Sequence, residues 1–128
     1  NEHYLMAIYE IDEEGVAVIR ARIARRLNIS APSVSEHINR MESQKLVKIN
    51  EKNIISLTKS GHKIAVGIVR RHRLAECLLV SYIGLDKNDA HKEADRLEHA
   101  IREKVEKKLA EVLGFPTHSP DGKIIPVN

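Results

Sequence analysis

Histidines and carboxylates recur at helical spacing in the second half of this 128-residue chain. His72 and Glu76 are four residues apart, so both side chains project from one face of a helix. His91 and Asp95 repeat that spacing on a later segment. Imidazole and carboxylate groups are ligands for divalent transition metals. One such pair is more often a solvated helix pair, but two pairs so close together favour a metal site.

A triplet of candidate ligands overlaps the second pair. Asp95, Glu98 and His99 stand at i, i+3 and i+4, which places three donors within one helical turn. Three donors supply half of an octahedral shell. His91 and His99 would lie about 12 Å apart along a helix axis, so two neighbouring sites are favoured over one.

Composition restricts the class of protein. The chain carries 21 Lys and Arg against 18 Asp and Glu, and this formal net charge of +3 mildly favours an anionic partner. Phe, Tyr and Trp make up only 3% of residues, so a stacking platform for single-stranded nucleic acid is not expected. The lone Cys77 excludes an intramolecular disulfide and fits a reducing cytoplasm. No apolar run is long enough to predict a membrane span.

The first half of the chain predicts a winged helix-turn-helix. Residues 19–27 form one short helix, and Ser30 caps the next, with Pro32 in its first turn. Two short apolar strands, 46–49 and 54–57, then flank a polar tip. A hairpin directly after a recognition helix is the pattern of a wing.

The second half predicts only helices and a tail. A long helix is expected from Thr58 to about Ile83, and two shorter helices follow. The whole is therefore expected to be a mainly α protein, a winged helix-turn-helix with a small two-stranded wing followed by an all-α domain. The predicted bounds are 1–64 for the winged helix-turn-helix domain, 65–114 for the helical metal-binding domain and 115–128 for an extended tail.

The helix-turn-helix predicts a surface that reads double-stranded DNA. A recognition helix presents its first turn and its exposed face to base edges, while arginines of the preceding helix and a wing lysine contact phosphates. Such arginines can also be a solvated face, but the adjoining wing favours DNA contact. Glu36 could accept a hydrogen bond from cytosine or repel phosphate. The candidate DNA contacts are Arg20, Arg22, Ser30, Ala31, Pro32, Ser33, Ser35, Glu36, Arg40 and Lys52.

Several motifs resemble the diphtheria toxin repressor and iron-dependent regulator family. The resemblance rests on residues 20–24, 32–35, 70–76, 83–86, 91–99 and 119–122 and covers essentially the whole chain. It implies a cytoplasmic homodimer that binds a palindromic operator when its metal is present and represses metal-homeostasis genes. It implies neither an organic cofactor nor catalytic residues.

The resemblance also assigns the ligands to two sites. His72, Glu76 and His91 match the ancillary site of the family, and His3, Asp95, Glu98 and His99 match its regulatory site. The resemblance further implies a dimerisation role for the helical domain, with contacts expected from Leu78, Leu79, Leu109 and Val112.

Two positions depart from the family pattern. Iron-type members usually have Cys in place of Asp95 and Met in place of His3, and manganese-type members have Glu in place of Asp95. An oxygen donor suits Mn(II) or Fe(II), whereas the imidazole favours Fe(II), Co(II), Ni(II) or Zn(II). We expect Fe(II), with Mn(II) as the alternative and the other ions as substitutes in vitro. The SH3-like C-terminal domain of many iron-type members is expected to be absent from this chain.

Other classes stay open. A winged-helix regulator that answers an organic ligand would bind DNA without metal dependence. A small metal-binding protein or metalloenzyme would have no DNA role, although the sequence offers no nucleophile–base pair and no phosphate-binding glycine loop. A pure protein-interaction module would leave the ligand spacing unexplained.

Overall fold

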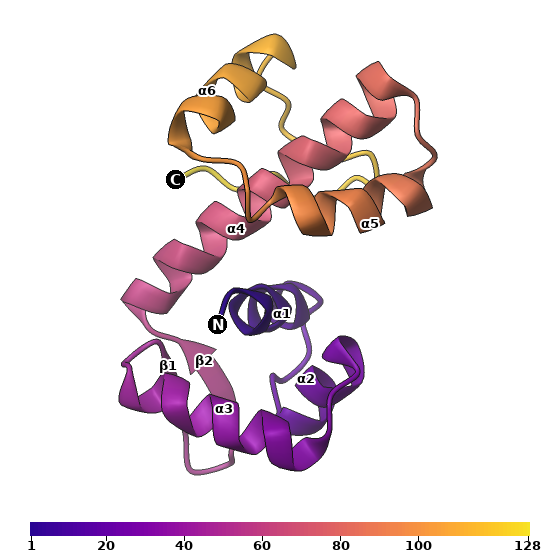
Figure 1. Ribbon diagram of the computed structural model, residues 1–128. Coiled ribbons are helices and arrows are strands. Elements are labelled where there is room, and N and C mark those ends of the chain that lie inside the picture. The colour runs from indigo at the N-terminus through magenta and orange to yellow at the C-terminus, as the bar shows by residue number, and fades with distance from the viewer. The chain divides into compact units, whose positions relative to one another are not determined.

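The computed structural model describes residues 1–128 as helices, a π-helical turn and one two-stranded hairpin (Figure 1). It divides into two compact units, residues 1–66 and residues 67–128, and the division falls within α4 (Lys59–Leu78). The first unit is a winged helix-turn-helix and the second is all-α, which confirms the predicted fold class.

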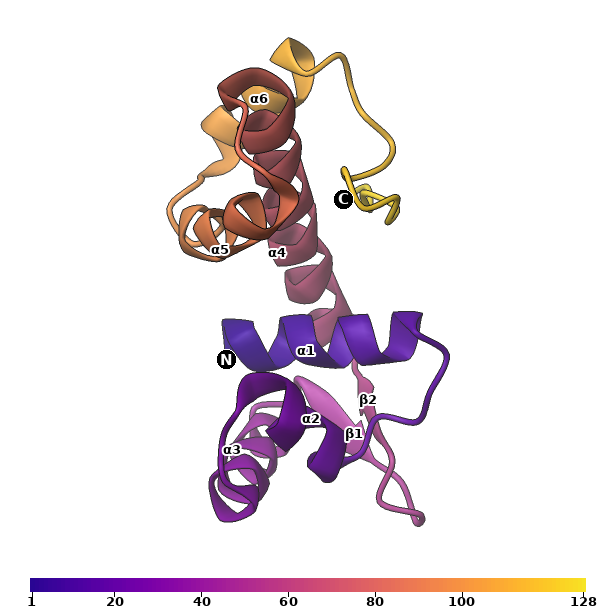
Figure 2. The same ribbon diagram turned by 90° about the vertical axis from the view of Figure 1, so that its right-hand side faces the viewer.

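The first unit is built on three helices and a hairpin (Figure 2). Asn28 adopts a left-handed conformation with φ of 54° and ends the second helix. Ser30 caps the third, because its Oγ accepts the backbone N–H of Ser33 at 3.3 Å. The elements are α1 (Glu2–Glu13), α2 (Arg20–Leu27), α3 (Ala31–Ser43), β1 (Val47–Ile49) and β2 (Ile55–Leu57).

Helix α3 separates the core of this unit from its outer surface. It buries Val34, Ile38 and Met41 completely and exposes most of its other side chains. Each buried side chain of this size contributes about 1.5–3 kcal/mol. Burial of this stripe therefore fixes which face of α3 points outward.

The hairpin is antiparallel, with Lys48 opposite Ser56. At its tip, the side-chain oxygen of Asn50 accepts the backbone N–H groups of Lys52 and Ile54 at 2.9 and 3.0 Å. At its base, a Cβ at Gly61 would lie 2.1 Å from the carbonyl oxygen of Leu46. Only glycine permits α4 to start this close to the hairpin.

The second unit packs helices of small and aliphatic residues against α4. Its elements are the rest of α4, the π-helical turn η1 (Leu79–Ile83), α5 (Lys87–Leu97) and α6 (Glu103–Val112). Ala75 and Leu79 meet Ala90 and Ala94 of α5 in one buried cluster. Because alanines face each other here, α4 and α5 approach closely, and their polar side chains can meet at the edge of this contact.

The tail is held against α4 by arginines. Arg70 donates to the carbonyl of Pro126 at 3.2 Å, and the buried Arg73 donates to that of Ile124 at 2.6 Å. Ile125, between those two residues, is buried in a cluster with Leu74 and Leu109. Ile125 therefore anchors the tail in the unit's core, although this segment lacks helices.

Two of the expected dimer contacts are used inside the unit instead. Leu79 and Leu109 are 6% and 9% exposed, so they pack in its own core, whereas Val112 is 59% exposed. None of the helices has the length and apolar character that crossing a membrane requires.

Candidate metal centre

Three candidate ligand side chains meet where α5 packs on α4. Nε2 of His72 lies 3.3 Å from Glu76 Oε1 and 3.2 Å from Nδ1 of His91, and His91 Nδ1 lies 3.3 Å from Glu76 Oε2. Donors bound about 2.1 Å from one ion are about 3.0–3.4 Å apart at octahedral to tetrahedral angles. The two nitrogens and the Glu76 carboxylate that contacts them are therefore spaced as ligands of one cation could be, and these are the residues that the family resemblance assigns to the ancillary site.

The His72 ring is buried and flanked by carboxylates. Burial by itself lowers the pKa of His72, but the neighbouring Glu76 and Glu98 outweigh it and raise that pKa to about 10. The same contacts overcome burial at Glu76 and lower the pKa of its carboxyl group. A proton therefore occupies the position that a cation would take, and metal and proton compete for this imidazole.

The other nitrogen of His72 faces two more predicted ligands. Its Nδ1 lies 3.3 Å from Asp95 Oδ1 and 3.2 Å from Glu98 Oε2. Asp95 is half-exposed, whereas Glu98 is 1% exposed. The predicted i, i+3 relation of Asp95 and Glu98 thus brings both carboxylates to a histidine on another helix.

Glu98 is the least satisfied polar residue of this region. Both its carboxylate oxygens and Nδ1 of His72 are buried without a hydrogen-bond partner. A buried carboxylate that accepts no hydrogen bond is costly, even with the His72 ring 3.2 Å from its Oε2. A divalent cation would remove that cost, and oxygen and imidazole donors suit Fe(II) or Mn(II). The residues present therefore fit a metal ion.

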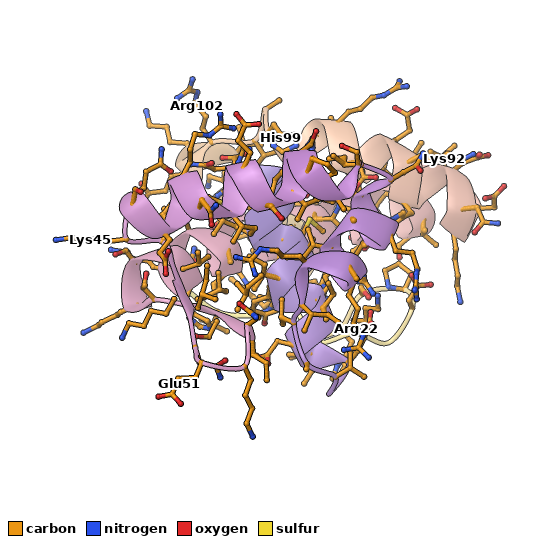
Figure 3. All side chains as sticks on the ribbon, turned by 90° about the horizontal axis from the view of Figure 1, so that it is seen from below. Arg22, Lys45, Glu51, Lys92, His99 and Arg102 are labelled. Atoms are coloured by element: carbon orange, nitrogen blue, oxygen red, sulfur yellow. The ribbon has the colours of Figure 1, made fainter.

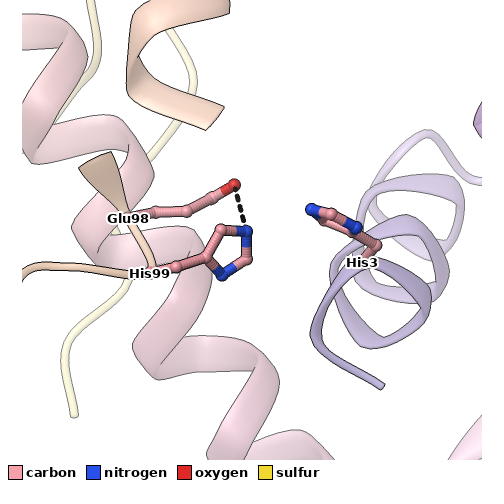
Figure 4. A group of neighbouring side chains, drawn as sticks. All are labelled: His3, Glu98 and His99. Atoms are coloured by element: carbon pink, nitrogen blue, oxygen red, sulfur yellow. Dashed lines mark ion pairs between the residues drawn. The ribbon is translucent and has the colours of Figure 1, made fainter. Parts of the chain in front are cut away.

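The predicted ligand triplet does not remain on one helix. Helix α5 ends at Leu97, with Glu98 as its C-cap, and His99 lies in the following turn. His99 Nε2 lies 3.6 Å from Glu98 Oε1 (Figure 4). The end of the helix allows these adjacent side chains to approach each other, which a regular helix does not favour.

Arg71 holds this helix end in place, a role the sequence analysis missed. Its Nε donates to the carbonyl of Glu98 at 3.1 Å, and its Nη1 lies 3.7 Å from the buried carboxylate of Glu106 on α6. A guanidinium here satisfies a carbonyl that α5 leaves unpaired. Arg71 and Glu98 are far apart in sequence, so no local spacing could reveal the contact.

The remaining regulatory-site candidate belongs to the first unit. His3 lies in the first turn of α1 and is exposed (Figure 4). Glu98 and His99 belong to the second unit.

The predicted DNA contacts of α3 lie largely on its exposed face. Ala31, Pro32, Ser33, Glu36 and Arg40 are exposed, and Ser35 is half-buried. Ser30 is also exposed, and its Oγ donates to the hydroxyl oxygen of Ser33 at 2.9 Å. These side chains are accessible to a duplex, and the hydrogen bond between Ser30 and Ser33 holds both hydroxyl groups in place.

The basic residues around α3 differ in solvent exposure and in the hydrogen bonds that they already make. Figure 3 labels Glu51 at the hairpin tip. Lys52, the next residue, is exposed, and Arg20 is half-buried. Arg22, on α2, uses one Nη1–H to bond the carbonyl of Ala17 at 2.8 Å. Its other donors remain available in principle for a phosphate.

A winged helix-turn-helix that is followed by a helical unit with clustered imidazole and carboxylate ligands defines a metal-binding winged-helix protein. Residues 1–54 match the family described as "Iron dependent repressor, N-terminal DNA binding domain". Residues 58–127 match "Iron dependent repressor, metal binding and dimerisation domain". The chain belongs to the iron-dependent repressor family, which confirms the resemblance seen in its sequence.

Known members are similar along nearly the whole chain. It is 47% identical to the iron-dependent repressor IdeR of Mycobacterium tuberculosis, over 98% of this chain and 54% of that protein. It is 46% identical to the diphtheria toxin repressor of Corynebacterium diphtheriae, over 98% and 55%. A solved manganese-dependent transcriptional repressor in complex with manganese superposes with a TM-score of 0.91 at 35% identity, over 98% and 58%. The chain spans about half the length of the curated relatives it matches.

Proposed function

We propose that this chain is the DNA-binding and metal-sensing part of a transcriptional repressor that takes Fe(II) as corepressor and controls metal-homeostasis genes. One observation carries the proposal: the buried Glu98 carboxylate and the buried Nδ1 of His72 lack hydrogen-bond partners. Family membership supports the DNA-binding half of the proposal, because residues 1–54 match a DNA-binding domain.

Two ligand groups would hold metal. His72, Glu76 and His91 form the ancillary group, and Asp95, Glu98 and His99 form the regulatory group, with His3 proposed as its fourth member from the family resemblance. A bound divalent cation supplies positive charge that neutralises these carboxylates and fixes the side chains around it. The chain's own part is to deliver neutral imidazoles and ionised carboxylates to that ion.

The regulatory step is proposed to act through α1. When His3 joins the regulatory ligands, α1 is restrained, and the recognition helix α3 that packs in the same unit is restrained with it. The winged helix then meets the major groove in one orientation, with Arg20, Arg22 and Lys52 on phosphates. By linkage, operator DNA tightens metal binding by the factor with which metal tightens DNA binding.

Fe(II) is proposed over Mn(II) because the curated relatives are iron-dependent or diphtheria toxin repressors. The six ligands described in the second unit are three imidazoles and three carboxylates, without sulfur, and this set suits either ion. Curated relatives at 46–47% identity are iron-dependent or diphtheria toxin repressors, whereas manganese-dependent neighbours stand at lower identity. Zn(II), Co(II) or Ni(II) are proposed as substitutes in vitro.

A homodimer on a palindromic operator completes the proposal. The family match describes residues 58–127 as a dimerisation domain. In this unit Tyr82, Ile83, Val112 and Phe115 are 59–68% exposed, and Tyr82 Oη donates to the carbonyl of Val112 at 2.9 Å. This apolar surface, with Val112 retained from the sequence prediction, is the proposed dimer contact.

The test is binding to a palindromic promoter fragment with anaerobic Fe(II), Mn(II), Zn(II) or chelator. We expect binding that requires metal and is lost with chelator, with Fe(II) or Mn(II) effective at the lowest free concentration. Equal binding under all conditions would overturn the sensor function and favour a regulator that answers an organic ligand. Metal binding without DNA binding would favour a metal-storage protein or metalloenzyme, which a turnover screen would identify.

A further inference from the structure

A histidine of the recognition helix connects α1 with a candidate DNA contact. The imidazole of His37, on α3, stacks on the ring of Tyr4 of α1, with centroids 3.9 Å apart and planes 2° from parallel. Its Nε2 lies 2.8 Å from the side-chain oxygen of Asn1, and its Nδ1 lies 3.0 Å from Nη2 of Arg40. Both ring nitrogens and one ring face are therefore engaged.

The partners decide which nitrogen carries the proton. A guanidinium has only donors, so Nδ1 must accept from Arg40, and Nε2 must then donate to the Asn1 oxygen. Partial burial, followed by the positive charge of Arg40, lowers the pKa of His37. The lowered pKa favours the neutral ring, and the hydrogen-bond partners select its tautomer.

Asn1 extends this contact along α3. Its Nδ2 donates to Oε1 of Gln44 at 2.9 Å, where α3 ends, while its Oδ1 accepts from His37 in the middle of the helix. Asn1 precedes α1 directly but makes no side-chain cap of that helix. Its amide instead joins the start of α1 to two points on α3.

Arg40 keeps the capacity to bind DNA while held in this way. Its side chain is exposed, and a guanidinium carries five N–H donors, of which His37 takes one. A guanidinium fixed in direction before binding loses less conformational freedom when it meets a base or phosphate.

We propose that His37 is a positioning residue that directs Arg40 toward double-stranded DNA and ties that direction to the first turn of α1. Its metal-dependent part rests on the proposed function, because His3 lies between Asn1 and Tyr4, the two residues that hold His37. A change at His3 on metal binding then reaches Arg40 through one imidazole ring.

The first test is a double-mutant cycle on affinity for a duplex selected by the unaltered chain from random DNA. We expect His37→Ala and Arg40→Ala each to weaken binding by about tenfold, and the double variant to bind no more weakly than Arg40→Ala alone. Ser43→Ala, an exposed change near the end of α3, should leave affinity unchanged. Full affinity in His37→Ala, or losses that multiply in the double variant, would overturn the proposal.

Conservative variants separate positioning from folding. His37→Asn keeps an acceptor near the place of Nδ1 and should recover most of the affinity lost in His37→Ala. His37→Gln keeps a donor near the place of Nε2, and it should recover less because Arg40 regains no partner. Equal affinities of the Asn, Gln and Ala variants, with matched thermal melts, would show that His37 is only a packing residue.

The metal-dependent part has its own readout. Asn1→Ala should lower the ratio of affinities with Mn(II) and with chelator by about threefold, a small coupling energy, without changing Mn(II) affinity in the absence of DNA. An unchanged ratio would overturn the link to α1. If the unaltered chain shows no metal dependence, the proposed function fails, while the cycle between His37 and Arg40 still decides the positioning role.

Discussion

The two sides of the His72 ring are built differently. On its Nε2 side, Glu76 and His91 complete a triangle with separations of 3.2–3.3 Å. On its Nδ1 side, Asp95 and Glu98 are equally close, yet the buried oxygens of Glu98 have no hydrogen-bond donor. On the Nε2 side the polar atoms have hydrogen-bond partners, whereas on the Nδ1 side the Glu98 oxygens accept no hydrogen bond.

The difference follows from where the ligands sit. His72, Glu76 and His91 project from the interiors of two helices that pack through alanines, so the fold itself assembles them. Glu98 and His99 lie where α5 has ended, and their backbone depends on the contact with Arg71. A preassembled site suits steady metal binding, whereas an unsatisfied one gains the most from a ligand and therefore suits a switch.

The largest effect is expected at Glu98, because its carboxylate is buried and neither oxygen has a hydrogen-bond partner. Glu98→Gln removes the desolvation cost of this buried charge, which exceeds its attraction to His72, so the metal-free chain should be more stable by about 1–3 kcal/mol. The same variant should lose the metal-dependent gain in operator affinity, which is about 5- to 150-fold for coupled sites. Thermal melts in chelator and DNA titrations in Mn(II) measure both changes.

Glu93→Gln is the matched control, since Glu93 is an exposed carboxylate on α5 and forms an ion pair with Arg96 at 3.6 Å. It should change neither quantity. If Glu98→Gln destabilised the metal-free chain, the contrast between the two sides of His72 would have to be abandoned.

The next largest effect is a difference in metal affinity between the His72→Ala and His91→Ala variants. His72→Ala removes a nitrogen from both sides and should weaken both metal-binding steps, by about 10- to 100-fold each. His91→Ala should weaken only the ancillary step and leave most of the operator response. Calorimetric titration of each variant with Mn(II) resolves the steps, and identical losses in the two variants would mean that the sides are one site.

A smaller loss of metal affinity is expected when the hydrogen bond from Arg71 to the Glu98 carbonyl is removed. Arg71→Met removes the donor to the Glu98 carbonyl and should weaken regulatory metal binding by about tenfold, as changes outside the ligand shell commonly do. Arg71→Lys should recover part of it through one remaining donor. An Arg96→Ala control, at an exposed site on α5, should bind normally, and a loss there equal to that of Arg71→Met would argue against a specific role.

A pH dependence of opposite sign is expected in the two forms of the chain. The pKa of His72 is raised to about 10, so its stabilising contribution is complete below pH 6.5 and is lost as pH rises through about 10. Metal-free stability should therefore fall above neutral pH. Metal binding needs neutral imidazole, so Mn(II) affinity should rise over the same range, by at most about tenfold per pH unit.

Melting temperatures at pH 7, 8 and 9, in chelator and in saturating Mn(II), test both signs. The stabilisation by Mn(II) should grow with each step in pH. A constant difference would show that no proton leaves His72 when metal binds.

The sequence determined the elements and the ligands that lie within one helix. The capped start of α3, the hairpin with its polar tip and the His72–Glu76 pair were predictable, because capping, alternation and i, i+4 spacing are local. Membership of the repressor family was equally readable, since its motifs are contiguous runs. The exact end of α5 could not be predicted from the sequence, and the helix stops before the predicted ligands Glu98 and His99.

Only the tertiary structure decided which side chains from different helices meet. It brings Glu98 to His72 and Arg71 to the Glu98 carbonyl, and it places His37 between Tyr4 and Arg40. The contacts of His72 with Glu98, of Arg71 with Glu98 and of Tyr4 with His37 join different elements, so no sequence spacing encodes them; only His37 and Arg40 are local, at i, i+3 on α3. Packing of small residues between α4 and α5 sets the first two contacts, and the buried stripe of α3 sets the third.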